Sequence, residues 1–171
     1  MARTVTPTYC QMMARYNAWQ NDQMLASMSE LSEDDLHEDQ GAFFGSILKT
    51  ASHIHWADGL WVSRFDGGEQ LDVDPSKHTD QFANLREYSD ARKSLDARLV
   101  KWSDRVDQAA LDSTLTFYVF TAGREATKPM SLLIPQFFNH QTHHRGQIHA
   151  MLTRKGVKAP VSDLFYLDWE S

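Results

Sequence analysis

Cysteine is almost absent from this chain of 171 residues, because Cys10 is the only one. A single cysteine excludes an internal disulfide and any zinc site built from cysteines, and it fits a reducing compartment. A lone cysteine among apolar helix residues behaves as a small hydrophobic side chain. We therefore expect Cys10 to be buried on the first helix.

Basic residues and long apolar runs are also scarce. The chain has 17 Lys and Arg against 23 Asp and Glu, a net charge of −6, which disfavours nucleic-acid and anionic-membrane partners. The longest apolar run, near residues 132–138, is broken by Pro135 and is too short to span a bilayer. The N-terminal MARTVTPTYCQ lacks the apolar region of a signal peptide. We expect a soluble, cytoplasmic protein with neither a nucleic-acid nor a membrane partner.

Several catalytic motifs are missing as well. The chain has no GxSxG elbow, no phosphate-binding glycine loop, no HExxH and no pattern that makes Cys10 a nucleophile. Gly41 and Gly45 fit a turn better than a phosphate site.

Four long segments repeat apolar residues every three or four positions, which is typical of amphipathic helices. They run from Pro7 into SMSELSEDD, from a cap at Ser46 to about Phe65, from a cap at Thr79 to about Trp102, and from about Ser131 to Lys155. Ser32 is expected to cap a short acidic turn after the first of them.

The segment between Leu111 and Lys128 has a different composition, rich in β-branched and aromatic residues around Ala122 and Gly123. This composition predicts two short strands. The length suits one domain over residues 1–171. The sequence thus predicts a mainly all-α four-helix bundle with a short β-like excursion before the last long helix.

Two histidine-rich segments stand out. His140 and His144 are four residues apart, so their imidazoles leave one face of the last helix. About ninety residues upstream, His53 and His55 lie in the second helical segment. At about 100° per residue these two point in nearly opposite directions, and only one can share an ion with the pair. His53 lies on the apolar face and is our choice, with His55 as the fallback.

Three imidazoles from two helices can bind a divalent ion such as Zn²⁺ or Ni²⁺ and leave a position open for water or a thiol. The alternative is that these histidines are hydrogen-bonded in the core without any ion. We expect the other histidines to be turned away or solvated, namely His143 and His149 on the last helix and His37 and His78 in polar loops.

Other side chains near these segments have two interpretations each. Asp58 and Glu38 are candidate acceptors for the ligand histidines, although solvated carboxylates are the more common case. Arg145 is expected at the surface or in an ion pair rather than on a substrate. The aromatic residues Trp19, Phe43 and Phe44 are expected in the core rather than on a partner surface.

Three segments, in order, resemble the DinB-like (DinB/YfiT-like) family of bacterial damage-inducible proteins: MARYNAWQNDQML, GAFFGSILKTASHIHWADGLWVSRF and FNHQTHHRGQIHAML. They include the YNxW and HxxxHRGQ signatures, and HIHWAD fits the family pattern H-I-x-x-A-[DE]. The family is unrelated to the error-prone polymerase of the same name.

The resemblance implies an up-down-down-up bundle, commonly a homodimer, with a divalent metal on His53, His140 and His144. It also implies similarity to transferases and isomerases that use low-molecular-weight thiols. Our first hypothesis is a zinc- or nickel-dependent thiol S-transferase acting on a small-molecule substrate. The alternatives are a metal-activated hydrolase, a non-catalytic stress-associated metal- or ligand-binding protein, and a vestigial triad.

Overall fold

The computed structural model describes residues 5–168, and helices dominate it. The long helices are α1 (Pro7–Met28), α3 (Ile47–Asp66), α4 (Leu85–Ser103) and α6 (Met130–Arg154). The shorter elements are α2 (Glu33–His37), η1 (Pro75–Lys77), α5 (Gln108–Leu111), β1 (Thr114–Val119), η2 (Phe120–Ala122), β2 (Arg124–Pro129) and η3 (Leu164–Tyr166). None of the helices in the described residues is long and apolar enough to cross a membrane.

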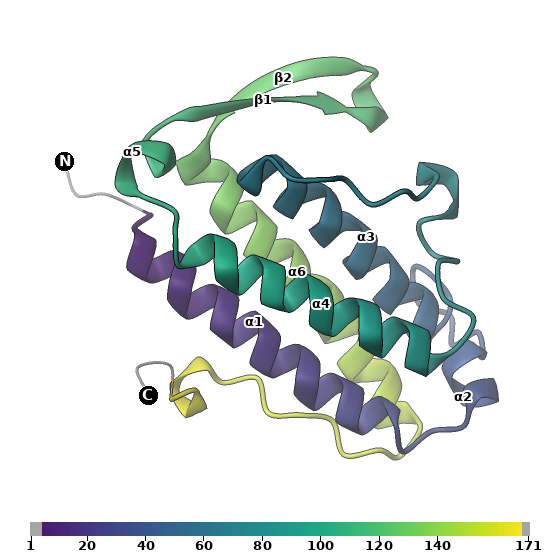
Figure 1. Cartoon of the computed structure of the whole chain (residues 1–171). Coiled ribbons are helices and arrows are strands. Elements are labelled where there is room, and N and C mark those ends of the chain that lie inside the picture. The colour runs from purple at the N-terminus through teal and green to yellow at the C-terminus, as the bar shows by residue number, and fades with distance from the viewer. Residues whose placement is uncertain (1–4, 169–171) are drawn as a thin grey trace.

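The four long helices form a bundle in which α1 and α6 run one way and α3 and α4 run the other (Figure 1). This is the up-down-down-up order. The connection 67–84 returns the chain along the bundle, so that α4 starts at the same end as α3. Helix α4 packs against both α1 and α3, and α6 closes the bundle against α3 and α1. The predicted four-helix bundle is confirmed.

Side-chain caps fix where the helices begin. Thr6, directly before the predicted start at Pro7, accepts from the backbone N–H of Tyr9. Ser46, the predicted cap of the second long helix, accepts from that of Lys49. The third long helix was predicted to start at Thr79, which is wrong. Its cap is Asn84, which accepts from the N–H of Glu87. Thr79 donates to the side chain of its neighbour Asp80 instead, and residues 79–84 remain a loop.

The predicted β excursion is an antiparallel hairpin of β1 and β2, with Phe117 opposite Ala126. Gly123 adopts φ 62° at the turn, a conformation that glycine accommodates without strain. On the inner side of the hairpin the Phe117 ring meets the Trp61 ring at 5.1 Å. The hairpin therefore covers one end of the bundle (Figure 1).

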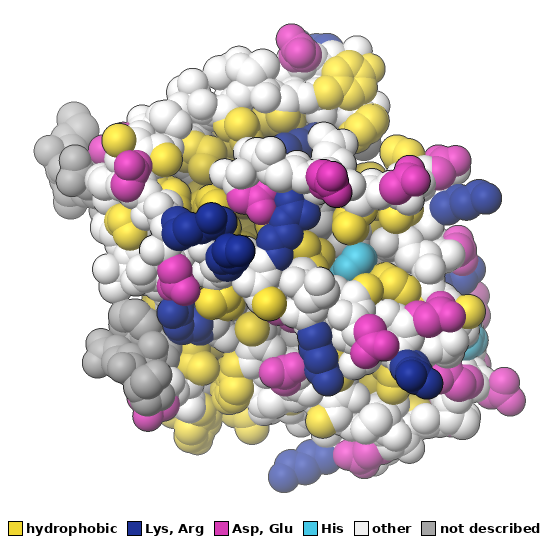
Figure 2. Space-filling model, in the orientation of Figure 1, with side chains coloured by type: hydrophobic (Ala, Val, Ile, Leu, Met, Phe, Trp, Pro, Cys, Tyr) yellow, Lys and Arg dark blue, Asp and Glu magenta, His cyan; other side chains and the backbone are white. Residues whose placement is uncertain are grey.

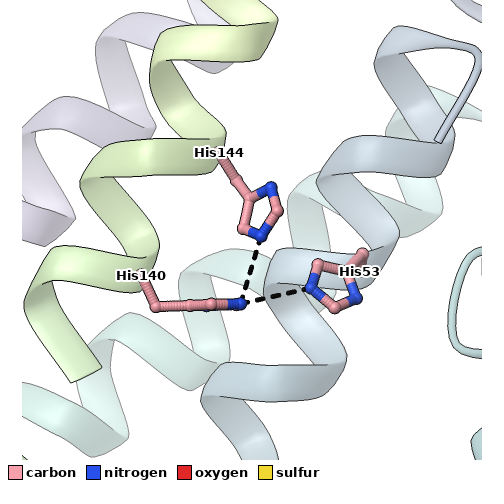
Figure 3. A group of neighbouring side chains, drawn as sticks. All are labelled: His53, His140 and His144. Atoms are coloured by element: carbon pink, nitrogen blue, oxygen red, sulfur yellow. Dashed lines mark hydrogen bonds between the residues drawn. The ribbon is translucent and has the colours of Figure 1, made fainter. Parts of the chain in front are cut away.

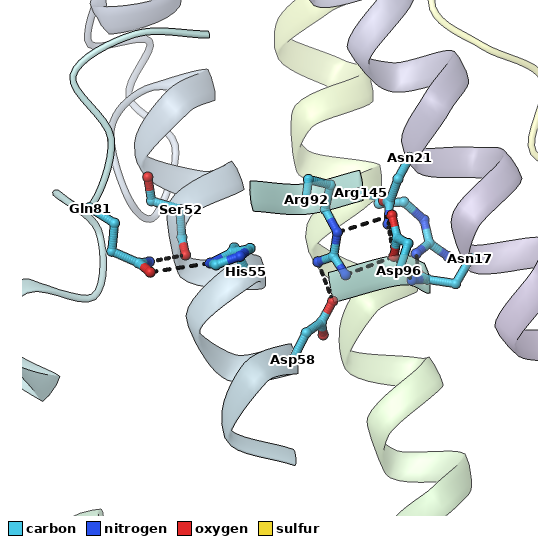
Figure 4. A network of polar contacts seen from close by, with 9 residues as sticks. All are labelled: Asn17, Asn21, Ser52, His55, Asp58, Gln81, Arg92, Asp96 and Arg145. Carbon is cyan, nitrogen blue, oxygen red and sulfur yellow. Dashed lines mark hydrogen bonds and ion pairs between the residues drawn. The ribbon is translucent and has the colours of Figure 1, made fainter. Parts of the chain in front are cut away.

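The interior has two apolar clusters separated by a polar layer. One cluster surrounds the fully buried Cys10, and the other surrounds Met28 and Ile148. Between them all four long helices contribute buried polar side chains: Asn17, Asn21, Asp58, Arg92, Asp96, Gln141 and Arg145. Burying so many polar groups is tolerated only where they pair with one another, as many of them do here (Figure 4).

Candidate metal centre

Three imidazoles converge between α3 and α6 (Figure 3). The Nε2 of His140 lies 3.3 Å from the Nε2 of His53 and 3.1 Å from the Nε2 of His144. Ligand atoms from the three rings all lie within 4.8 Å of one another. His144 is buried, and the other two rings are half-buried. The structure thus brings together the three histidines that the sequence nominated.

Helix geometry explains the arrangement. Residues four apart lie one turn above each other, so α6 presents His140 and His144 side by side. Helix α3 packs directly on α6 and supplies His53 from the facing side. His55 points away, as the helical wheel predicts, and its Nδ1 lies 3.2 Å from Oε1 of Gln81.

Hydrogen bonds at the outer nitrogens orient the rings. Nδ1 of His144 lies 2.8 Å from Oε1 of Gln147, so this nitrogen carries the proton and donates to the amide oxygen. The Nε2 of His144 is then a lone-pair donor directed at the cluster. Nδ1 of His53 contacts Nδ1 of His78 at 2.9 Å, which also leaves the Nε2 of His53 on the cluster side. The Nε2 of His140 faces both of these lone pairs: with its proton on Nε2 it donates to them, and with its proton on Nδ1 it adds a third lone pair, which gives the set that a cation can bind.

The site keeps its imidazoles neutral at neutral pH. Burial, reinforced by the neighbouring imidazoles His144, His140 and His78, lowers the pKa of His53 to about 3. Burial and the same kind of neighbours lower the pKa of His140 to about 4. Burial also lowers the pKa of His144, although its hydrogen bond to Gln147 opposes this. Because metal ligands must be deprotonated, the three rings are ready to bind an ion.

The distances suit a first-row divalent ion. Zinc lies about 2.0–2.1 Å from imidazole nitrogen, so two tetrahedral ligands are about 3.3–3.4 Å apart and two octahedral neighbours about 2.9 Å apart. The two separations from His140, 3.1 Å to His144 and 3.3 Å to His53, fall in this interval, and the ligand atoms of all three rings lie within 4.8 Å of one another. Within residues 5–168 no carboxylate or fourth histidine belongs to the cluster. The residues therefore fit a metal with open coordination positions.

An aromatic wall borders the cluster. The Phe44 ring lies 4.2 Å from the ring of His53 and 5.4 Å from that of His144. Gly41 and Gly45 have φ values of 68° and 81°, which confirms them as turn glycines that place this ring. Phe44 is half-buried, but Phe43 is 83% exposed, so the prediction of a core position for Phe43 is wrong. The two rings are in edge-to-face contact, with their centroids 4.8 Å apart, and Phe43 forms the outer one.

The histidines outside the cluster differ in their exposure to solvent. His143 and His149 are exposed on α6, as expected, and His37 is exposed with Nε2 3.1 Å from the carbonyl of Ala83. The expectation of a solvated His78 is wrong, because this side chain is half-buried against His53. His78 lies in a loop, where no periodic sequence pattern predicts which way a side chain points. Its contact with His53 depends on the folded path of the connection 67–84.

Neither carboxylate considered as an acceptor serves the cluster. Asp58 is buried and accepts from Nη1 of Arg92 at 2.7 Å, so it is neither solvated nor bonded to a ligand histidine. Glu38 is exposed and pairs with Lys155. Arg145 was expected at the surface or in an ion pair, but it is buried and donates to Oδ1 of Asn17.

Comparisons with known proteins identify the family and the fold of the chain. Protein DinB of Bacillus subtilis (strain 168) is 28% identical over 152 residues, which cover 86% of this chain and 87% of that protein. The crystal structure of a DinB-like protein from Bacillus cereus ATCC 10987 superposes with a TM-score of 0.65 at 20% identity, over 85% of this chain and 90% of the other, which shows a shared fold. The sequence model of the DinB family matches residues 1–171. The chain therefore belongs to the DinB family.

Proposed function

We propose that this chain is a divalent-metal-dependent enzyme whose ion is held by His53, His140 and His144. The observation that carries this proposal is the convergence of three neutral imidazole nitrogens without a fourth side-chain ligand among the described residues. Structural zinc sites are usually closed by four protein ligands, whereas catalytic sites keep a position for water or substrate. Zinc and nickel both suit an all-imidazole set.

The proposed reaction is transfer of a low-molecular-weight thiol to an electrophilic small molecule. A divalent ion in this site would lower the pKa of a thiol bound at its open position, so that a thiolate is available near neutral pH. The thiolate sulfur would form a bond to the electrophilic carbon, the leaving group would depart with its electron pair, and the thiol proton would pass to solvent.

The residues of the chain support this chemistry in defined ways. Gln147 fixes the ring of His144, and Phe44 shields one side of the cluster from water. Neutral ligands leave the full charge of the ion to act on a bound thiol. A hydrolase would need a base for the attacking water, and no carboxylate of residues 5–168 joins the cluster.

The test is turnover by protein reconstituted with zinc or nickel. We expect metal-dependent loss of free thiol when glutathione, bacillithiol or mycothiol is supplied with an electrophilic substrate, measured with a thiol-reactive dye. Metal-free protein is the control. Turnover without added thiol would favour the hydrolase. Tight metal binding without turnover for any thiol would favour a non-catalytic stress-associated binding protein.

We also propose that the chain forms a homodimer through α1 and α4. Figure 2 shows this face, where apolar surface lies between acidic and basic side chains. A groove of about 1290 Å³ runs between the two helices, and its lining includes the small residues Ala18, Ala26 and Ala97. Sedimentation velocity should give twice the monomer mass, and Ala97→Glu should shift it to the monomer. A monomeric wild type would contradict the proposal.

A further inference from the structure

The connection 67–84 carries His78 onto the outer side of the candidate metal centre. Nδ1 of His78 lies 2.9 Å from Nδ1 of His53, and the two rings meet edge to face at 4.9 Å and 71°. The His78 ring also contacts Trp56 at 5.3 Å and Phe44 at 5.6 Å. His78 is therefore held among three rings.

A second set of contacts fixes the backbone of this connection to α3 (Figure 4). Nε2 of Gln81 donates to the carbonyl of Ser52 at 2.5 Å and to the carbonyl of His78 at 2.8 Å. Oε1 of Gln81 lies 3.2 Å from Nδ1 of the buried His55. His55 does not join the triad. Its ring contacts the side-chain amide of Gln81, and that amide in turn fixes the backbone at His78.

The contact between the two Nδ1 atoms can contain only one proton. If the Nε2 of His53 is to face an ion with its lone pair, the proton of this ring must be on Nδ1. Nδ1 of His78 must then accept it, with the proton of His78 on its own Nε2. Metal-bound histidines generally donate their second N–H to a neighbouring acceptor, and that acceptor orients the ring.

We propose that His78 is a positioning residue that accepts the Nδ1–H of His53 and so holds the Nε2 of His53 toward the ion. This inference rests on the proposed metal site and adds a member that the triad does not contain. His78 is not itself a ligand of that ion, because its Nδ1 meets the side of the His53 ring that faces away from His140.

The test compares two variants that differ in one acceptor atom. His78→Phe keeps an aromatic ring between Trp56 and Phe44 but removes the acceptor, whereas His78→Asn can place a carbonyl oxygen near the position of Nδ1. We expect zinc affinity, measured by competition with a chromophoric chelator, to fall about 10–100-fold in His78→Phe. His78→Asn should recover most of this loss. The visible spectrum of the cobalt-substituted protein should change in His78→Phe and return in His78→Asn.

Each other outcome contradicts the proposal in a different way. Wild-type affinity in His78→Phe would show that the contact does not position His53. Equal losses in His78→Phe and His78→Asn would show that the imidazole itself is required, as for a fourth ligand. If the wild type binds neither zinc nor cobalt, the metal site fails and this inference fails with it. Urea unfolding of the metal-free variants identifies any general loss of stability, and His149→Phe on the exposed side of α6 is the matched control.

Discussion

Replacing His144 with alanine is expected to lower zinc affinity by more than about 100-fold. Loss of a residue that only orients a metal ligand typically costs about 10–100-fold, and loss of a ligand should exceed this. His144 is the most buried ring of the cluster and approaches His140 at 3.1 Å, so no solvent-exposed side chain can take its place without repacking. Competition with a chromophoric chelator measures the affinity, and elemental analysis of the purified protein measures the metal content.

The matched control for this experiment is His149→Ala, which removes an exposed histidine from the same helix. It should bind zinc as the wild type does. Zinc at about 100 times its Kd should also raise the free energy of unfolding of the wild type by about 2.7 kcal/mol, and it should do so in His149→Ala but not in His144→Ala. If His144→Ala retains both the metal and this stabilisation, the triad is not the binding site, and a vestigial cluster or a site elsewhere becomes the better account.

The triad could be predicted because both of its determinants are local. The spacing of His140 and His144 needs only the geometry of one helix. On the other helix the direction of successive side chains allows only one of His53 and His55 to join them, and the apolar face favoured His53. The starts of α1 and α3 were predictable for a similar reason, since Thr6 and Ser46 satisfy backbone N–H groups three residues ahead.

The remainder of the site depends on contacts that no local pattern encodes. His78 is 25 residues from His53 in sequence and belongs to a loop whose path is fixed by the hydrogen bonds of Gln81. Thr79 has the chemistry of a helix cap, but Asn84 has it too, and only the packed bundle decides between them. Phe43 and Phe44 are identical in type and adjacent in sequence, yet one is exposed and the other borders the histidines.

The burial of the charged side chains was the hardest feature to predict from the sequence. Average behaviour assigns Asp58 and Arg145 to the surface, because isolated charges are rarely buried. Here two aspartates and two arginines share the polar layer at mid-bundle, so that their formal charges cancel. Asn17 and Asn21 donate to Asp96 at 3.0 Å and complete the set. Mutual compensation of this kind involves three or four helices at once and has no signature in a single segment.

The second large effect that we expect is a loss of stability when Arg92, the central cation of this layer, is replaced. Arg92 is fully buried and donates to Asp58 at 2.7 Å and to Asp96 at 2.7 and 3.1 Å. Arg92→Met would keep most of the side-chain volume and leave two buried carboxylates without their cation. Breaking a buried ion pair in this way costs about 3–5 kcal/mol, a large share of the roughly 5–15 kcal/mol by which a typical domain is stable. Urea unfolding at neutral pH measures this loss.

The matched control is Arg98→Met on the same helix, where the arginine makes the same two-pronged contact with Asp66 but is partly exposed. A surface pair is worth at most about 1 kcal/mol, so this variant should lose far less stability.

The pH dependence of the free energy of unfolding further distinguishes Arg92→Met from Arg98→Met. Burial raises the pKa of Asp58 to about 6 while Arg92 opposes the rise, so that removing Arg92 raises this pKa further above its value in the unfolded chain. A raised carboxyl pKa costs stability as the pH increases through it, so Arg92→Met should be less destabilised at pH 5 than at pH 7.5. Equal losses in the two variants, or a loss in Arg92→Met that does not change with pH, would mean that water already compensates the charges of this layer.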